Sequence, residues 1–82
     1  MEAFNGKWID EKKVNIVVSG KENFLTVEYG NERGSFQAFE IDLTSPVINV
    51  NFTDDKPWVG VLGVNNGKTI IYWINGTTWT KQ

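Results

Sequence analysis

The acidic side chains best placed to do chemistry are Asp54 and Asp55, which stand side by side just before Lys56. Hydrolysis of a glycosidic bond needs two carboxyl groups on either side of the bond, one with a pKa raised by burial. This pair falls in an expected turn, where solvent keeps both groups ionised and where Asp is favoured because it bonds its own backbone. We therefore expect a structural role for the pair in the turn and no hydrolytic reaction.

The composition excludes several other reactions. The chain has no histidine and no cysteine, which removes a thiol nucleophile, a Ser–His catalytic pair and the usual ligands of transition metals. A calcium site needs several oxygen ligands in a fixed loop, and the Asn and Asp side chains between residues 49 and 55 supply only some of them. We expect a chain that is not an enzyme and that carries no cofactor and no metal.

Binding is the chemistry that the residue types favour. Tryptophan beside Asn, Asp and Thr is typical of sugar-recognition surfaces, where the flat ring stacks on the apolar side of a sugar and polar groups bond its hydroxyls. The expected site combines two stacking rings with four polar side chains: Trp58, Trp73, Asp54, Asp55, Asn75 and Thr78.

Three consecutive antiparallel strands position most of this site. Asn-Gly occupies the centre of two turns, at 66–67 and 75–76, and is the strongest short-range hairpin signal because both residues tolerate positive φ. With two-residue loops at both turns, three cross-strand pairs follow: Leu62 with Ile71, Gly60 with Trp73, and Tyr72 with Trp79.

The period-two alternation of strands divides these side chains between two faces. We assign to the core the more uniformly apolar face: Val59, Val61, Ile70, Tyr72, Ile74 and Trp79. The opposite face is also apolar where water is expected: Trp58, Leu62, Val64, Ile71 and Trp73. We interpret this second face as covered by another part of the chain or a subunit, or as a ligand platform. A loop one residue longer or shorter would exchange the two faces.

The whole chain predicts an all-β fold. Eight short strands are expected at 5–9, 14–19, 24–29, 35–43, 47–52, 58–64, 69–74 and 77–81. They form one domain over residues 1–82, a small antiparallel meander that is either a closed up-and-down barrel or a two-sheet sandwich. An interior of this size is filled by side chains, so we expect a packed core and no lipid-sized cavity.

The strand at 35–43 changes the parity of its apolar residues. Phe36 and Ala38 share one parity, and Phe39 begins a run of the other. A bulge near Ala38-Phe39 would reconcile the two halves. Glu40 and Asp42 are then expected on the solvated side.

Charge and hydropathy limit the partners. The net charge is −2 and the basic residues are scattered, whereas nucleic-acid binding needs a basic stripe. No apolar run approaches the roughly 18 residues of a membrane-spanning helix. We expect neither a nucleic acid nor a membrane as partner, and the absence of cysteine leaves the compartment open.

Two stretches resemble known proteins. The opening Gly6-Lys7-Trp8 resembles the Gly-x-Trp of lipocalins and avidin-like barrels, which implies that Trp8 plugs one barrel end; the arginine that packs on this Trp in lipocalins is replaced by Lys81. A longer set of residues resembles the C-terminal half of small bacterial all-β domains: 50–55, 60–62, 67–73 and 75–81. Those domains end in an Ile-x-Trp-x-Asn-Gly-Thr-x-Trp pattern, which is residues 71–79 here. That resemblance implies the fold and a bacterial origin, and no particular activity.

These observations lead to three alternatives for function. The first is a non-enzymatic binding or interaction module that forms a homo-oligomer through its aromatic sheet face. The second is a lectin-like, carbohydrate-binding domain that uses exposed tryptophan. The third is a barrel that holds a small ligand in its mouth.

Overall fold

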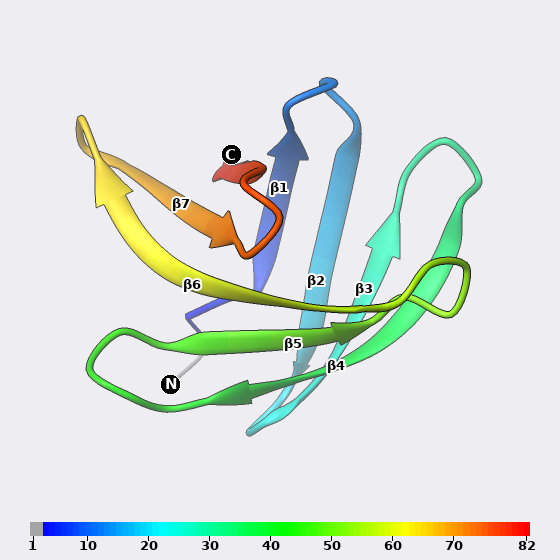
Figure 1. The fold of residues 1–82 in the computed structure, drawn as a ribbon, viewed down its shortest axis with the longest axis horizontal. Coiled ribbons are helices and arrows are strands. Elements are labelled where there is room, and N and C mark those ends of the chain that lie inside the picture. Colours follow the sequence, from blue (N-terminus) through cyan, green and yellow to red (C-terminus); the bar gives the residue numbers. More distant parts are fainter. Residues whose placement is uncertain (1–2) are drawn as a thin grey trace.

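The computed structural model describes residues 3–82, which form a closed barrel of antiparallel strands (Figure 1). The strands are β1 (Gly6–Asp10), β2 (Asn15–Lys21), β3 (Phe24–Tyr29), β4 (Gly34–Ile41), β5 (Val47–Asn51), β6 (Pro57–Asn65), β7 (Lys68–Trp73) and β8 (Thr78–Lys81). Each strand pairs with the next along the chain, and β8 pairs with β1 to close the barrel. The predicted all-β meander is confirmed, and it closes as a barrel instead of splitting into a sandwich.

The β6–β7 hairpin has the predicted geometry. Asn66 and Gly67 form its loop with φ values of 52° and 75°, as a two-residue hairpin turn with two positive φ angles requires. This loop places Leu62 opposite Ile71 and Gly60 opposite Trp73. The first Asn-Gly turn therefore sets the register that the sequence predicts.

The β7–β8 connection is longer than predicted. The amide of Gly76 donates to the carbonyl of Trp73 (2.9 Å), and the amide of Trp73 donates to the carbonyl of Thr77 (2.9 Å). Gly76 has a φ of 89°, so the loop comprises three residues with glycine in the left-handed position, a known alternative to the two-residue loop. Trp79 consequently pairs with Ile71, and the predicted pairing with Tyr72 is wrong.

The predicted assignment of the two faces of β6 and β7 is also wrong, whereas Trp79 is buried as predicted. Ile71 and Trp73 point into the barrel with exposed fractions of 0% and 6%, whereas Tyr72 and Ile74 point outward. The three-residue loop turns Trp79 to the inner side as well, because a shift of one residue reverses the face of every side chain. The tryptophan-bearing face is thus the interior of the barrel, and Trp73 is not available on an outer sheet surface for self-association or stacking.

Strand β4 is regular and carries no bulge. Its residues from Gly34 to Phe39 pair one to one with β3, so Phe36, Ala38 and Glu40 all point inward. The predicted bulge is wrong, and so is the solvated position of Glu40, which is only 2% exposed. Asp42 lies on the surface as predicted.

Glu40 is a carboxylate on the buried side of β4. Neither of its side-chain oxygens has a hydrogen-bond partner within the described residues 3–82. Burial, reinforced by the nearby Asp42 carboxylate, raises the pKa of Glu40 to about 7 because the charged form is poorly solvated there.

One part of the barrel interior is filled by residues from near the start of the chain. Phe4 and Trp8 are fully buried, and the Trp8 indole donates from Nε1 to the carbonyl of Phe4 (2.8 Å). The Nζ atom of Lys81 lies 5.4 Å from the centre of the Trp8 ring, a cation–π distance. Trp8 thus packs the interior where β1 meets the last residues of β8.

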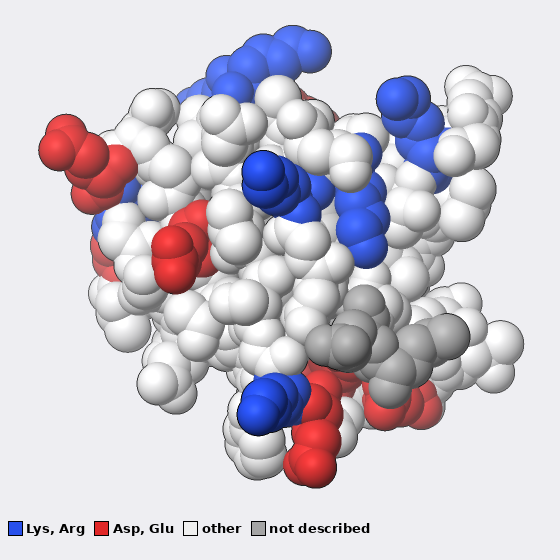
Figure 2. All heavy atoms as spheres, turned by 180° about the vertical axis from the view of Figure 1, so that it is seen from behind, with Lys and Arg blue, Asp and Glu red and all other residues white. Residues whose placement is uncertain are grey.

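The outer surface is mixed in character. Seen from behind, Lys and Arg gather toward the upper half and Asp and Glu toward the left and lower edges, with uncharged surface between them (Figure 2). Among residues 3–82 there is no helix that could cross a membrane.

Candidate functional site

Four loops meet at one end of the barrel. Because every strand reverses direction, alternate connections of a meander fall at the same end. The connections at this end follow the odd-numbered strands and cover residues 11–14, 30–33, 52–56 and 74–77. The predicted polar residues between 54 and 78 are therefore gathered around a single opening, which we call the barrel mouth.

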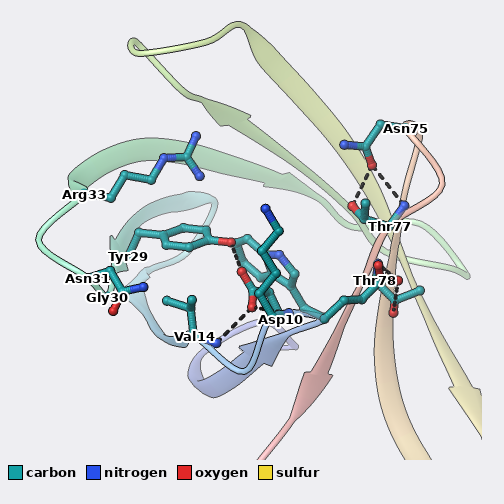
Figure 3. Close-up of a pocket in the computed structure, with 12 residues that line it drawn as sticks. Asp10, Val14, Tyr29, Gly30, Asn31, Arg33, Asn75, Thr77 and Thr78 are labelled. Carbon is teal, nitrogen blue, oxygen red and sulfur yellow. Dashed lines mark hydrogen bonds between the residues drawn. The ribbon is translucent and has the colours of Figure 1, made fainter.

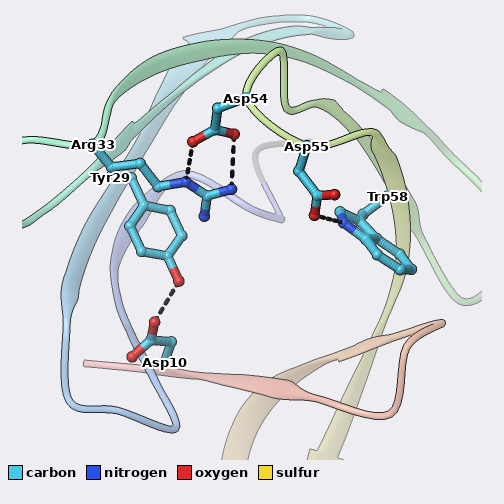
Figure 4. A network of polar contacts seen from close by, with 6 residues as sticks. All are labelled: Asp10, Tyr29, Arg33, Asp54, Asp55 and Trp58. Atoms are coloured by element: carbon cyan, nitrogen blue, oxygen red, sulfur yellow. Dashed lines mark hydrogen bonds and ion pairs between the residues drawn. The ribbon is translucent and has the colours of Figure 1, made fainter.

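Asp10 organises the first of these loops. Its Oδ1 accepts hydrogen bonds from the amides of Lys12 and Val14, both at 2.9 Å, and such side-chain bonds to nearby amides stabilise turns. Its Oδ2 accepts a hydrogen bond from the Tyr29 hydroxyl. Burial and this bond to Asp10 raise the pKa of Tyr29 above its ordinary value, so the phenol stays protonated and fixed across the mouth (Figure 4).

Arg33 closes one side of the mouth. Its guanidinium binds Asp54 through Nε at 2.8 Å and Nη2 at 3.0 Å, the two-point geometry that arginine favours with carboxylates. The same group lies 4.6 Å from the Tyr29 ring centre and 4.5 Å from that of Phe52. This ion pair holds the pKa of Asp54 below its ordinary value, so both groups remain charged and largely neutralise each other.

Asp55 and Trp58 face this pair from the β5–β6 connection (Figure 4). Trp58 Nε1 donates to Asp55 Oδ2 at 2.9 Å, and the Nζ atom of Lys56 lies 5.0 Å from the Trp58 ring centre. Within residues 3–82 only Oδ2 of the Asp55 carboxylate is engaged. Its Oδ1 is left as an acceptor at the mouth.

Aromatic rings form the layer beneath these polar groups. Ring centres are 4.7 Å apart for Trp73 and Trp79, 5.8 Å for Tyr29 and Trp79, and 5.0 Å for Phe36 and Phe52. All three pairs meet edge to face, a favoured geometry worth roughly 0.5–1.5 kcal/mol per pair. The rings form a rigid apolar floor below the mouth.

Two connected cavities occupy the mouth. The wider one, about 360 Å³, is lined by residues of three loops and of the adjoining strand ends, Asn75 and Thr78 among them. The narrower one, about 120 Å³, reaches down between Trp58, Trp73 and Trp79 and includes Asp55. Tyr29, Arg33, Asn75, Thr77 and Trp79 line both cavities. In Figure 3, Asn75 and Thr77 stand on one side of the opening and Tyr29 and Arg33 on the other.

Trp73 carries a buried donor without a partner. The residue lines the narrow cavity and is 6% exposed, and its Nε1 has no hydrogen-bond partner within the described part of the chain. A buried N–H without a partner costs roughly 1–3 kcal/mol. Burial of this indole is therefore stabilised by the aromatic packing around it and not by a hydrogen bond.

The mouth brings together most of the predicted site residues. Trp58, Trp73, Asp55 and Asn75 line the narrow cavity, and Thr78 lines the wide one. Trp73 is buried beneath the mouth and does not form the exposed stacking surface that was predicted. Asp54 lines neither cavity and instead holds Arg33 in place.

Several residues of the mouth are missing from the sequence-based prediction of the site, and three of them form its polar contacts. Asp10, Tyr29 and Arg33 lie far from residues 54–78 along the chain and become neighbours only because alternate loops of a closed meander share one end. The predicted strand order places the loops that carry these residues at the end where the fifth and seventh strands end, but only closure of the barrel, which the sequence left open, brings them around one opening.

The fold and site define a small closed barrel with a polar, aromatic-floored cavity at one end. Within residues 3–82, no group of three or more His, Cys, Asp or Glu side chains is arranged to hold a metal ion. The chain matches no family model, no curated protein and no solved structure.

Proposed function

We propose that the chain is a non-catalytic binding module that takes a carbohydrate in the barrel mouth. The observation that carries this proposal is the hollow of about 360 Å³ at the mouth, where polar side chains from three loops lie beside the rings of Tyr29 and Trp79. Pre-formed cavities with apolar walls and a few directed polar groups are the usual form of small-molecule sites.

The distribution of groups in the mouth favours a sugar over a purely apolar ligand. The wide cavity offers side chains of Asp10, Glu11, Asn31 and Thr77 to hydroxyl groups. Its volume of about 360 Å³ falls within the roughly 300–1,000 Å³ of typical ligand cavities. The half-buried ring of Trp58 supplies an apolar surface at the edge of the narrow cavity.

A titration with a panel of neutral mono- and disaccharides tests this proposal. Three of the four tryptophans line the narrow cavity, so we expect binding to change the tryptophan emission. Trp58→Leu removes the aromatic surface and should weaken binding about tenfold, the equivalent of losing one favourable ring contact of about 1.4 kcal/mol. Tyr72→Leu, which removes an exposed ring from the outer face, is the matched control and should bind normally.

The proposal fails if no sugar changes the emission or the amide spectrum of the mouth residues at high millimolar concentration. It also fails if the two substitutions weaken binding equally, because the sugar would then lie outside the mouth.

A further inference from the structure

Three neighbouring strands present no charge on the outside of the barrel. Strands β4, β5 and β6 contain a single charged residue, Glu40, and its side chain is buried. These strands lie at the front in Figure 1, whereas the opposite side carries Lys, Arg, Asp and Glu (Figure 2). We infer that the outward side of β4–β6, which we call the uncharged wall, is a docking surface for the same wall of a second copy of this chain.

Two exposed rings and a hollow mark the centre of this contact. Phe24, at the edge of the wall, pairs directly with Phe39, and both side chains are well exposed. They border a hollow of about 420 Å³, whose lining also includes Asn51 and Pro57. An exposed apolar patch of this kind, with polar groups around it, is typical of a protein–protein contact. In a two-fold contact each copy offers both features, so the ring of one copy can enter the hollow of the other.

The polar groups of the wall suit an identical partner. Those that line the hollow are the amides of Gln37, Asn49 and Asn51. An amide side chain has both an acceptor oxygen and an N–H₂ donor, so each of these residues can pair with the same residue type on a second copy. A partner selected by its charge would find no opposite charge on this wall. Two copies with a net charge of −2 each can meet here without placing like charges in contact, which costs binding energy elsewhere.

The size of the wall predicts a weak association. The molecule measures 31 × 26 Å along its two longer axes, and Figure 1 views it along the third. A stable interface buries about 800 Å² on each partner, which is close to the whole of this side. Strands β4–β6 occupy only part of it (Figure 1). The contact therefore belongs to the weak, concentration-dependent class, and the dimer should form at millimolar concentration.

Two opposite charges introduced at Gln37 test the inference. Gln37 is exposed and lines the hollow, so Gln37→Lys and Gln37→Glu each bring like charges into the contact between identical copies. By sedimentation equilibrium, each variant alone should associate about tenfold more weakly than the original chain, or less still. An equimolar mixture of the two should recover the association, because opposite charges then share one contact. Failure of the mixture to recover would overturn the inference, since the two walls would not meet.

Lys7→Gln is the matched control. It changes the net charge from −2 to −3, as Gln37→Glu does, but on the exposed side of β1. In the closed ring β1 lies four strands away from β5 in either direction. The association should be unchanged. Equal weakening by Lys7→Gln and Gln37→Glu would overturn the inference, because the net charge and not the uncharged wall would then govern association.

A spin label locates the contact directly. The chain has no cysteine, so Asn51→Cys provides one labelling position at the hollow. Unlabelled protein that carries a nitroxide on this cysteine is mixed with the ¹⁵N-labelled original chain. The label should broaden the amide signals of β4 and β5 in the other copy and leave those of β1 sharp. Broadening confined to another side of the barrel would overturn the inference.

The remaining outcomes concern other occupants of the wall. A chain that stays monomeric at millimolar concentration overturns the inference. A monomeric chain that sediments with neutral phosphatidylcholine vesicles, and loses this binding in Gln37→Glu, would assign the wall to a lipid surface instead. Neither result bears on the sugar proposal, because the wall lies on the side of the barrel and the mouth lies at its end.

Discussion

At the scale of single residues, Glu40 is an ionisable side chain at a position that the fold buries. Its position on β4 follows from Phe36 and Ala38, which share its parity and must enter the core. The carboxylate is therefore buried without a hydrogen-bond partner within residues 3–82, and it can be accommodated at low cost only when protonated. Folding and protonation of Glu40 are thus coupled.

This coupling predicts a stability that falls as the pH rises. The pKa of Glu40 moves from 4.5 to about 7 on folding, so between these values the folded state binds more protons than the unfolded state. The free energy of unfolding should therefore fall through this interval, by roughly 3 kcal/mol in total, and level off above about pH 8. Glu40→Gln should remove this component and unfold at higher urea concentration than the original chain at pH 8.

Urea unfolding of both chains at pH 4.5, 6 and 8 measures the effect. Glu28→Gln, which changes an exposed carboxylate of β3, is the control and should keep the slope of the original chain. Asp42→Asn should lower the slope in part, because Asp42 contributes to the raised pKa of Glu40. An identical pH slope in the original chain and in Glu40→Gln would contradict the coupling.

At the scale of elements, Gly60 fixes how β6 lies against β7. A β-carbon built on Gly60 would meet Ile71 Cγ2 at 2.5 Å and a ring carbon of Trp73 at 2.9 Å, and both neighbours are buried in the core. Gly60→Ala should therefore destabilise the barrel by about 1–3 kcal/mol through overpacking. Thermal or urea unfolding gives this value directly.

Gly63 on the same strand provides the matched control. A β-carbon there would meet only the ring of Tyr72, at 2.8 Å, and this side chain is 43% exposed and free to rotate outward. Gly63→Ala should change stability by less than about 1 kcal/mol, because relief of backbone entropy offsets the shift of the ring. Equal destabilisation by the two substitutions would show that the floor of the mouth is not tightly packed.

Local sequence signals predicted the positions of strands and turns better than they predicted which face of each strand is buried. The meander and the β6–β7 register followed from one Asn-Gly turn, whose two positive φ angles permit one pairing. The second Asn-Gly is identical in sequence, yet Gly76 sits third in a three-residue loop. Only tertiary packing distinguishes these loops, because burial of Trp79 beside Trp73 requires the longer one. The faces of β6 and β7 were exchanged for another reason: their register was right, but the more uniformly apolar face was assigned to the core and lies on the outside.

At the scale of the whole molecule, closure of the barrel explains what was predicted of the site and what was missed. Trp58, Asp55 and Asn75 are close enough in sequence to be grouped by strand ends alone. Asp10 and Arg33 join them only because β8 pairs with β1 and completes the ring. The choice between barrel and sandwich was open in the sequence, so the contribution of the first four strands to the mouth could not be derived.

Closure also determines how the molecule could associate with itself. A closed barrel has no free strand edge, so association must use outward side chains. Phe24 and Phe39 form a direct cross-strand pair and are 76% and 49% exposed. They border a hollow of about 420 Å³ on the outer surface. This pair is the exposed aromatic feature that a second copy would cover.

We therefore expect a mass above 9.3 kDa by light scattering at millimolar concentration, and a return to the monomer mass in Phe24→Thr/Phe39→Thr. Threonine keeps the strand propensity of both positions. The free energy of unfolding of the double variant should therefore differ from that of the original chain by less than about 1 kcal/mol. Val61→Thr, at a less exposed outward position, should leave the mass unchanged. A monomer mass for the original chain over the whole concentration range would rule out self-association and the homo-oligomer alternative. The proposal of a sugar site at the mouth does not depend on this result.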